Sequence, residues 1–137
     1  MSALVSPTVS ALAAGVLIVG QTGLALAVVG ARRRAGQSLG EGGDPALLRA
    51  IRRHGNYAEN AAIFVVCLAL LEMLGAARWF VAALAVVFIV GRALHAVGLS
   101  QPATSNPWRF AGAIATALAG FGVGVRLVLL AASQLAG

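Results

Sequence analysis

Four long apolar runs constrain the fold of this chain more than any other feature of its sequence. The first, residues 7–31, has no charged side chain, and about 20 apolar residues in a helix are enough to cross the hydrocarbon core of a membrane. We expect four such helices, over residues 7–31, 45–74, 78–99 and 107–134. A chain of 137 residues that is 60% hydrophobic and 10% charged cannot hide that surface as a soluble domain. The sequence therefore predicts one all-α domain, residues 1–137, in which four transmembrane helices form an antiparallel bundle.

Proline and capping residues mark where three of these helices begin. Each of these starts has a polar residue followed by proline, in the pairs Ser6-Pro7, Asp44-Pro45 and Asn106-Pro107. Proline suits the first helical turn, where its missing N–H is not needed, and the polar side chain before it can cap the helix. We therefore expect these three pairs to be helix starts.

The arginines predict how the helices are oriented in the membrane. All ten basic residues are arginines, and eight of them border the two longer loops: Arg32, Arg33, Arg34, Arg49, Arg52, Arg53, Arg92 and Arg109. The positive-inside rule then places both long loops in the cytoplasm and both termini outside. The net charge of +6 does not indicate nucleic acid as a partner, because the arginines border or interrupt apolar runs. At the outer end we expect Glu72 and Arg126 to form a structural ion pair.

Polar and charged side chains gather at the start of the second expected helix. At about 100° per residue, an arc of roughly 120° contains six of them: Arg49, Arg52, Arg53, Asn56, Glu59 and Asn60. Glu59 lies about 10 Å along the helix from Arg52, below the headgroups, where a charge costs about 2.5–3.5 kcal/mol on insertion scales. We therefore expect this stripe to face the bundle interior or a wet cavity, with Glu59 as a buried acid. His54 and Tyr57 lie outside the arc and are expected to contact another helix or subunit.

A second polar set, near the end of the third expected helix, converges on the same region. Arg92 and His95 are three residues apart and share a helix face. The third helix ends where the second begins, at a level that Arg109 and Arg32 to Arg34 also reach. Such a pocket suits a small polyanion with one cationic group, since arginines bind carboxylates as forks and favour a neighbouring thiolate. For Arg33 and Arg34, a role as topology markers or as contacts to anionic lipids is the favoured alternative.

No other chemical motif stands out. The sequence has no glycine-rich phosphate loop, no paired Cys or His at metal-ligand spacing, and no Ser/His/Asp arrangement that this topology could assemble. Cys67, the only cysteine, permits no intrachain disulfide and is expected to be a small core residue. The glycines of the fourth run predict close helix packing: Gly120, Gly122 and Gly124.

Two short motifs carry a family resemblance. They are Arg52-Arg-His-Gly-Asn-Tyr-Ala-Glu-Asn60 at the start of the second run and Gly91-Arg-Ala-Leu-His95 late in the third. In these motifs and over nearly its whole length the chain resembles the MAPEG family, the membrane-associated proteins of eicosanoid and glutathione metabolism. Its short loops are similar to those of the small bacterial members. The resemblance implies a homotrimer in the bacterial inner membrane, with glutathione bound between neighbouring subunits near the cytoplasmic side.

The resemblance also implies roles for individual residues. By motif position, four residues bind glutathione: Arg52, Asn56, Glu59 and Arg92. His54 and His95 match motif positions nearby, and Arg32 matches a glutathione-contacting arginine. Arg109 matches the catalytic arginine that stabilises the glutathione thiolate. Leu99 stands where many family members have a tyrosine.

The implied function is that of a membrane-bound glutathione transferase. With glutathione as co-substrate, it would conjugate an apolar electrophile, or reduce a lipid hydroperoxide, that arrives from the bilayer. Two alternatives stay open. Leu99 at a ligand position is compatible with a non-catalytic protein that binds glutathione or lipid. A small four-span transporter would also need a buried glutamate, although it would more often carry that acid in the first span, which has no charge here.

Overall fold

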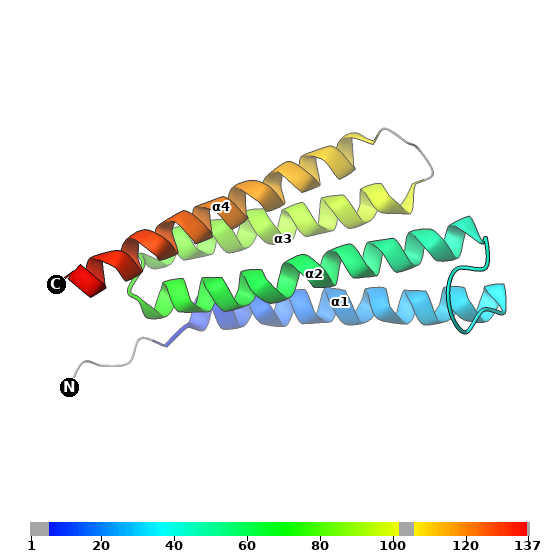
Figure 1. Cartoon of the computed structure of the whole chain (residues 1–137), viewed down its shortest axis with the longest axis horizontal. Helices are drawn as coiled ribbons and strands as arrows, with labels where there is room; N and C mark the ends of the chain where they lie inside the picture. Colours follow the sequence, from blue (N-terminus) through cyan, green and yellow to red (C-terminus); the bar gives the residue numbers. More distant parts are fainter. Residues whose placement is uncertain (1–5, 102–105, 137) are drawn as a thin grey trace.

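Four helices make up the described part of this computed structural model, residues 6–101 and 106–136, and no strand occurs there. They are α1 (Thr8–Ala35), α2 (Pro45–Met73), α3 (Arg78–Ser100) and α4 (Pro107–Ala136). Each is long and apolar enough to cross a membrane. Successive helices run in opposite directions, so that α1 begins and α4 ends at the same end of the bundle (Figure 1). The predicted all-α membrane fold with four spanning helices is thereby confirmed.

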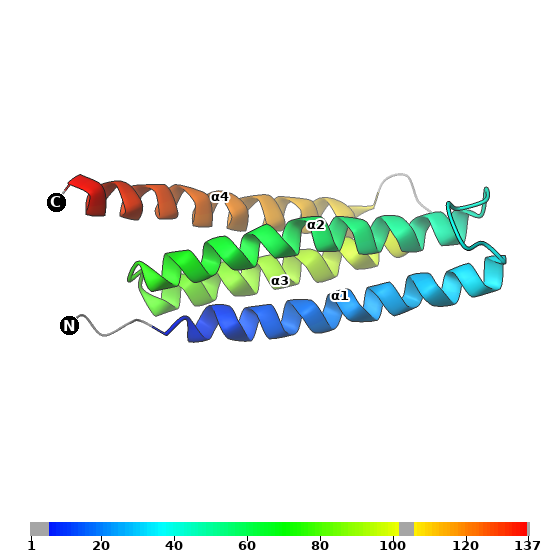
Figure 2. The ribbon, with the colours of Figure 1, turned by 60° about the horizontal axis from the view of Figure 1, so that its bottom comes forward.

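The outer helices α1 and α4 lie on opposite sides of the pair formed by α2 and α3 (Figure 2). The contact between α3 and α4 is the most extensive in the bundle. Helix α1 packs on α2 and α3 but, within the described ranges, does not contact α4. A site that needs side chains from both α1 and α4 is therefore not formed by direct contact of these two helices within one chain.

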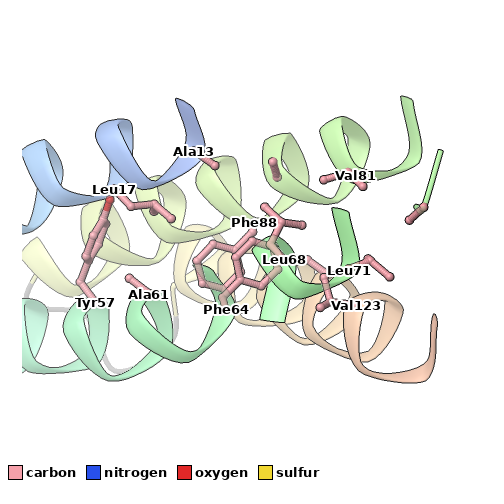
Figure 3. Close-up of a cluster of buried hydrophobic side chains, with 13 residues drawn as sticks. Ala13, Leu17, Tyr57, Ala61, Phe64, Leu68, Leu71, Val81, Phe88 and Val123 are labelled. Carbon is pink, nitrogen blue, oxygen red and sulfur yellow. The ribbon is translucent and has the colours of Figure 1, made fainter. Parts of the chain in front are cut away.

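Aromatic side chains hold the central pair of helices together. Phe64 of α2 and Phe88 of α3 stack with ring centroids 3.7 Å apart and planes 5° apart, and apolar side chains from all four helices surround them (Figure 3). Tyr57 points from α2 toward α1. A Cβ at Gly20 would lie 2.6 Å from the Tyr57 hydroxyl, so the tyrosine ring occupies space that the absence of a side chain at Gly20 leaves. The predicted contact of Tyr57 with another helix is confirmed.

Helix α1 continues beyond its predicted end at Ala31, through three arginines to Ala35. Gly36 ends it in the left-handed conformation, with φ of 65°. Arginine is a good helix former, and cations in the last turn are favourable at the negative end of the helix dipole. The arginines thus belong to the helix, and apolar content alone placed its end four residues too early.

The start of α1 differs from the prediction, whereas the start of α2 agrees with it. Asp44 caps α2 as expected, because its Oδ1 accepts hydrogen bonds from the N–H groups of Ala46 (2.7 Å) and Leu47 (3.1 Å). Helix α1 has no capping side chain in its own segment, so Ser6 is not the predicted cap. The unpaired N–H groups of its first turn are instead satisfied from α2.

Glu72 of α2 supplies that cap, and the predicted ion pair of Glu72 with Arg126 is wrong. The carboxylate accepts hydrogen bonds from the backbone N–H groups of Val9 (3.1 Å) and Ser10 (2.8 Å), and from the Ser10 hydroxyl (2.7 Å). Glu72 is fully buried. A helix start presents unpaired N–H groups and a partial positive charge, which stabilise a carboxylate, so Glu72 needs no arginine partner.

Glycines bring α3 and α4 into backbone contact. A Cβ at Gly112 would lie 2.5 Å from the backbone nitrogen of His95, and one at Gly98 would lie 2.5 Å from that of Arg109. Of the three glycines predicted to mediate packing, only Gly122 does so, against Leu84. A Cβ added at Gly120 or at Gly124 would have no atom within 4 Å, so these two glycines face open space instead.

Candidate functional site

A cavity of about 630 Å³, here called the polar groove, lies at the loop end of the bundle where α2 begins, α3 ends and α4 begins. Its lining consists of Glu41, Leu48, Ile51, Arg52, Gly55, Asn56, Glu59, His95, Leu99 and Arg109. Five of the eight site residues expected from the sequence are therefore brought together: Arg52, Asn56, Glu59, His95 and Arg109. The close approach of α3 and α4 places the last two side by side.

The charges around the polar groove are mixed. Arg52 and Arg109 are cationic, whereas Glu41 and Glu59 are anionic. A ligand that carries both carboxylate and ammonium groups can pair with both kinds of side chain, since arginine forks bind carboxylates and a carboxylate accepts hydrogen bonds from an ammonium group. The lining has as many anionic as cationic side chains and therefore suits a small zwitterionic molecule.

Glu59 is not the buried acid that the sequence predicted. It is exposed in the single chain and lies at the edge of the polar groove. The helical angle correctly put Glu59 on the face of Arg52, but that face borders a groove and is not covered by another helix of the chain. Arg49 and Arg53 were predicted in the same arc, but they line a different cavity. The buried acid of the described chain is Glu72, more than three turns further along α2.

Arg92 lies behind the polar groove and not in its lining. Only 2% of its surface is exposed. Its Nη1 donates hydrogen bonds to the side-chain oxygen of Asn56 (2.7 Å) and to the backbone oxygen of the same residue (3.0 Å). The Arg92 Nε is buried without a hydrogen-bond partner in the described structure. The amide oxygen of Asn56 accepts this hydrogen bond from Arg92. The amide nitrogen of the same side chain is therefore the group that can donate to a ligand in the groove.

A second cavity of about 760 Å³, the apolar groove, runs along α4. It shares Asn56 and His95 with the polar groove, and its other lining residues are Asn60, Arg92, Ala113, Thr116, Ala117, Gly120, Phe121, Gly124, Val125, Val128 and Leu129. Gly120 and Gly124 leave this space open. Its volume lies within the range of about 300–1,000 Å³ that is typical of small-molecule sites. A polar and an apolar compartment thus meet at Asn56 and His95.

Two expected site residues lie elsewhere. Arg32 is on α1, where its Nη1 donates a hydrogen bond to the backbone oxygen of Gly40 (2.8 Å), and α1 does not contact α4 within the described ranges. His54 is partly buried and lines neither groove. In one subunit, Arg32 and His54 therefore do not contribute to the polar groove.

Sequence patterns missed two polar residues of the site. Glu41 enters the polar groove from the loop between α1 and α2, and the path of a loop has no periodicity from which to predict it. Thr116 lines the apolar groove and donates its hydroxyl hydrogen to the backbone oxygen of Gly112 (2.7 Å). Its position could have been predicted, since it lies on α4 one turn from Gly112 and Gly120.

Comparison with known proteins agrees with the motifs. A model of the MAPEG family matches residues 10–129, a range that contains every residue of both grooves. The chain is also similar to the inner membrane protein YecN of Escherichia coli, found in two strains, with 36% identity over 89 residues. That match covers 65% of this chain, and it spans 66%, just under two thirds, of the length of YecN.

Proposed function

This chain belongs to the MAPEG family, and on that premise we propose that it is a glutathione transferase of the inner membrane. Glutathione would occupy the polar groove, and an apolar electrophile or a lipid hydroperoxide would enter the apolar groove from the bilayer. Both long loops would face the cytoplasm, where glutathione is available. One observation carries this proposal: the two grooves share Asn56 and His95.

The polar groove has the side chains that glutathione requires. The tripeptide carries two carboxylates and one ammonium group around a central thiol. Arg52 and Arg109 can bind carboxylates or a thiolate, and Glu59 can pair with the ammonium group. Asn56 contributes an amide whose oxygen is already engaged by Arg92. The groove volume of about 630 Å³ falls within the range of small-molecule sites.

The chemical step needs only a thiolate and a positioned electrophile. The Arg109 guanidinium beside the thiol would favour loss of the thiol proton to water, and the resulting thiolate is the nucleophile. Its electron pair forms a carbon–sulfur bond as the leaving group departs with its own pair, for example as chloride. Catalysis would rest on proximity and on electrostatic stabilisation of the thiolate, without a covalent enzyme intermediate.

We further propose that the complete site requires a homotrimer. The polar groove is open in one subunit, with Glu59 and Arg109 exposed. Arg32 belongs to α1, and α1 lies on the opposite side of the bundle from α4 (Figure 2). In a cyclic assembly, α1 of a neighbouring subunit would cover the groove and supply Arg32 to it.

Conjugation of glutathione to 1-chloro-2,4-dinitrobenzene by the purified protein tests the proposal. We expect Arg109→Ala to lower kcat/KM about a hundred-fold, the typical loss when one group that stabilises developing charge is removed. Arg126→Ala is the matched control, because it removes the same charge from the exposed face of the same helix. Equal rates in the two variants would remove Arg109 from the mechanism.

The alternative is a protein that binds glutathione without turnover, and one observation favours it. Leu99 lines the polar groove at a position where many members of the family have a tyrosine. If glutathione raises the midpoint of thermal unfolding while no electrophile is conjugated and no hydroperoxide is reduced, the binding function is the correct one.

A further inference from the structure

A third cavity, of about 450 Å³, lies on the other side of α2 from the polar groove and is here called the basic cavity. It is bounded by the end of α1, the start of α2 and Ser100 at the end of α3. Three arginines contribute to its lining: Arg34, Arg49 and Arg53. It shares no residue with the polar groove. The proposed transferase function makes no use of it.

The arginines of the basic cavity lack an anionic partner among the described residues. No carboxylate lines the cavity. Arg53 donates a hydrogen bond from Nη1 to the Ser100 hydroxyl (2.6 Å), but its Nε is buried without a partner in the described structure. Neither Arg34 nor Arg49 forms a side-chain hydrogen bond to another described residue. Three guanidinium groups around one space repel one another and create a strongly positive potential that attracts an anion.

The arginine of α1 is directed into this space by the helix itself. Helical side chains point toward the N-terminus of their helix, and Nη1 of Arg34 lies 3.5 Å from the position that a Cβ at Gly30 would occupy. The guanidinium therefore folds back over Gly30, which also lines the cavity. Its neighbour Arg33 does not line the cavity, although both arginines are exposed.

The rest of the lining indicates which anion fits. Leu26 and Ala27 form a small apolar wall about two turns from Arg34 toward the middle of α1, and Ala46 and Ala50 alternate with the arginines on α2. Arg34 and Arg49 stand near the loop end of the bundle, where α1 ends and α2 begins, and Arg53 lies one turn deeper on α2 than Arg49. A cationic end next to an apolar wall suits a molecule with a phosphate group attached to an acyl chain. Arginine is well suited to phosphate, since its planar fork donates two hydrogen bonds at once.

We propose that the basic cavity binds the phosphate group of an anionic phospholipid from the bilayer, with an acyl chain along Leu26 and Ala27. A soluble phosphate has the same headgroup chemistry and is the competing source. The lipid would join α1 to α2 at the end of the bundle opposite the Glu72 cap. This site is independent of glutathione binding.

Binding of phosphatidylglycerol to the full-length protein in uncharged detergent, measured by native mass spectrometry, tests this proposal. We expect Arg49→Gln to weaken binding about five-fold and the Arg49→Gln/Arg53→Gln double variant about twenty-five-fold, at about five-fold per arginine. Arg33→Gln is the matched control, since it removes the same charge at the same level outside the cavity, and its binding should equal that of the wild type. Equal losses in Arg33→Gln and Arg49→Gln would overturn the proposal.

Two further arms identify the source of the phosphate. Diacylglycerol with the same acyl chains should not bind, and inorganic phosphate at millimolar concentration should not displace the phospholipid. Displacement by inorganic phosphate would assign the cavity to a soluble anion and overturn the proposal of a lipid.

Arg49→Lys distinguishes loss of charge from misfolding. It keeps the charge and should recover part of the affinity that Arg49→Gln loses. Arg109→Ala should bind the lipid normally, so that failure of the transferase proposal is distinguishable from failure of this one.

Discussion

At the scale of single residues, Arg92 illustrates how a side chain can serve the polar groove without belonging to its lining. It is almost completely buried, and its hydrogen bonds in the described structure all go to Asn56. Burying a guanidinium opposite a neutral amide is costly, because no opposite charge compensates the lost hydration. The arrangement fixes the Asn56 side chain at the junction of the two grooves. We therefore interpret Arg92 as a positioning residue for Asn56.

A double-mutant cycle tests that interpretation. Arg92→Met and Asn56→Ala should each weaken glutathione binding about ten-fold, since a hydrogen bond to a charged group contributes about 1.5–3 kcal/mol. Because Arg92 acts through Asn56, the double variant should bind no more weakly than either single variant. Isothermal titration calorimetry in detergent gives the affinities. An additive loss of about a hundred-fold would mean that Arg92 contacts the ligand independently.

At the scale of secondary-structure elements, the two ends of α1 are held in different ways. Its C-terminal end closes locally, with three arginines and then Gly36. Its N-terminal end depends on Glu72, which is distant in sequence and belongs to α2. Helix α1 contacts α2 and α3 but, within the described ranges, not α4. The hydrogen bonds to the Glu72 carboxylate are therefore a main polar attachment of its first turn.

Removing the carboxylate should loosen that attachment. Glu72→Ala leaves two N–H groups and the Ser10 hydroxyl without their acceptor, at a cost of about 1–3 kcal/mol for the buried groups. We expect a lower midpoint of thermal unfolding in detergent and faster proteolysis of the start of α1. Glu59→Ala is the matched control, because Glu59 is exposed on the same helix and its loss should leave the midpoint nearly unchanged. Equal stabilities of the two variants would contradict the capping role.

The packing of α3 on α4 gives a second prediction at this scale. In Gly112→Ala the new Cβ would lie 2.5 Å from the backbone nitrogen of His95 and 2.6 Å from the backbone oxygen of Gly91. Backbone atoms within helices cannot move aside singly, so α4 must shift away from α3, at a cost of about 1–3 kcal/mol. We expect a lower unfolding midpoint together with lower transferase activity.

Gly15→Ala is the control for this packing prediction. Gly15 lies on α1 with no atom within 4 Å of the added Cβ. Alanine has the higher helix propensity by about 0.8–1.0 kcal/mol, so this variant should be as stable as the wild type or slightly more stable, with unchanged activity. A Gly112→Ala variant that behaved in the same way would show that α3 and α4 need no backbone contact.

At the scale of the whole molecule, the arrangement of the helices separates two arginines that the proposed reaction uses together. Arg109 lines the polar groove on α4, whereas Arg32 lies on α1 beyond the central pair of helices. Many apolar side chains on α1 and α4 are exposed in the single chain, Leu12 (74%) and Phe121 (74%) among them. Lipid or neighbouring subunits must cover such surface.

Mixing inactive subunits tests whether neighbours complete the site. Arg32→Ala and Arg109→Ala subunits, coexpressed, should assemble some sites with both arginines intact, and random assortment predicts about a quarter of the wild-type activity. Arg52→Ala with Arg109→Ala is the control pair, because both residues line the groove of one subunit and no mixed site regains both. Recovery in neither pair would mean that Arg32 and Arg109 act within one subunit, so that a neighbour does not supply Arg32.

The sequence alone determined those features that depend on neighbours along the chain. Long apolar runs gave the number of helices, Asp44-Pro45 gave the start of α2, and the helical period put Arg52, Asn56 and Glu59 on one face. Each of these follows from local geometry: a hydrogen-bonded helix repeats every 3.6 residues and its caps act within one turn.

Only the tertiary structure decided which helix lies beside which, and with it the partner of every long-range polar group. Glu72 caps α1 and does not meet Arg126, because the first turn of α1 lies beside it. Arg92 turns to Asn56 because α2 and α3 cross there, Glu59 is exposed because no helix of the same subunit covers its face, and Arg32 is remote because α1 and α4 lie on opposite sides. Helical periodicity fixes the direction of a side chain, but what that side chain meets depends on packing between segments far apart in the chain.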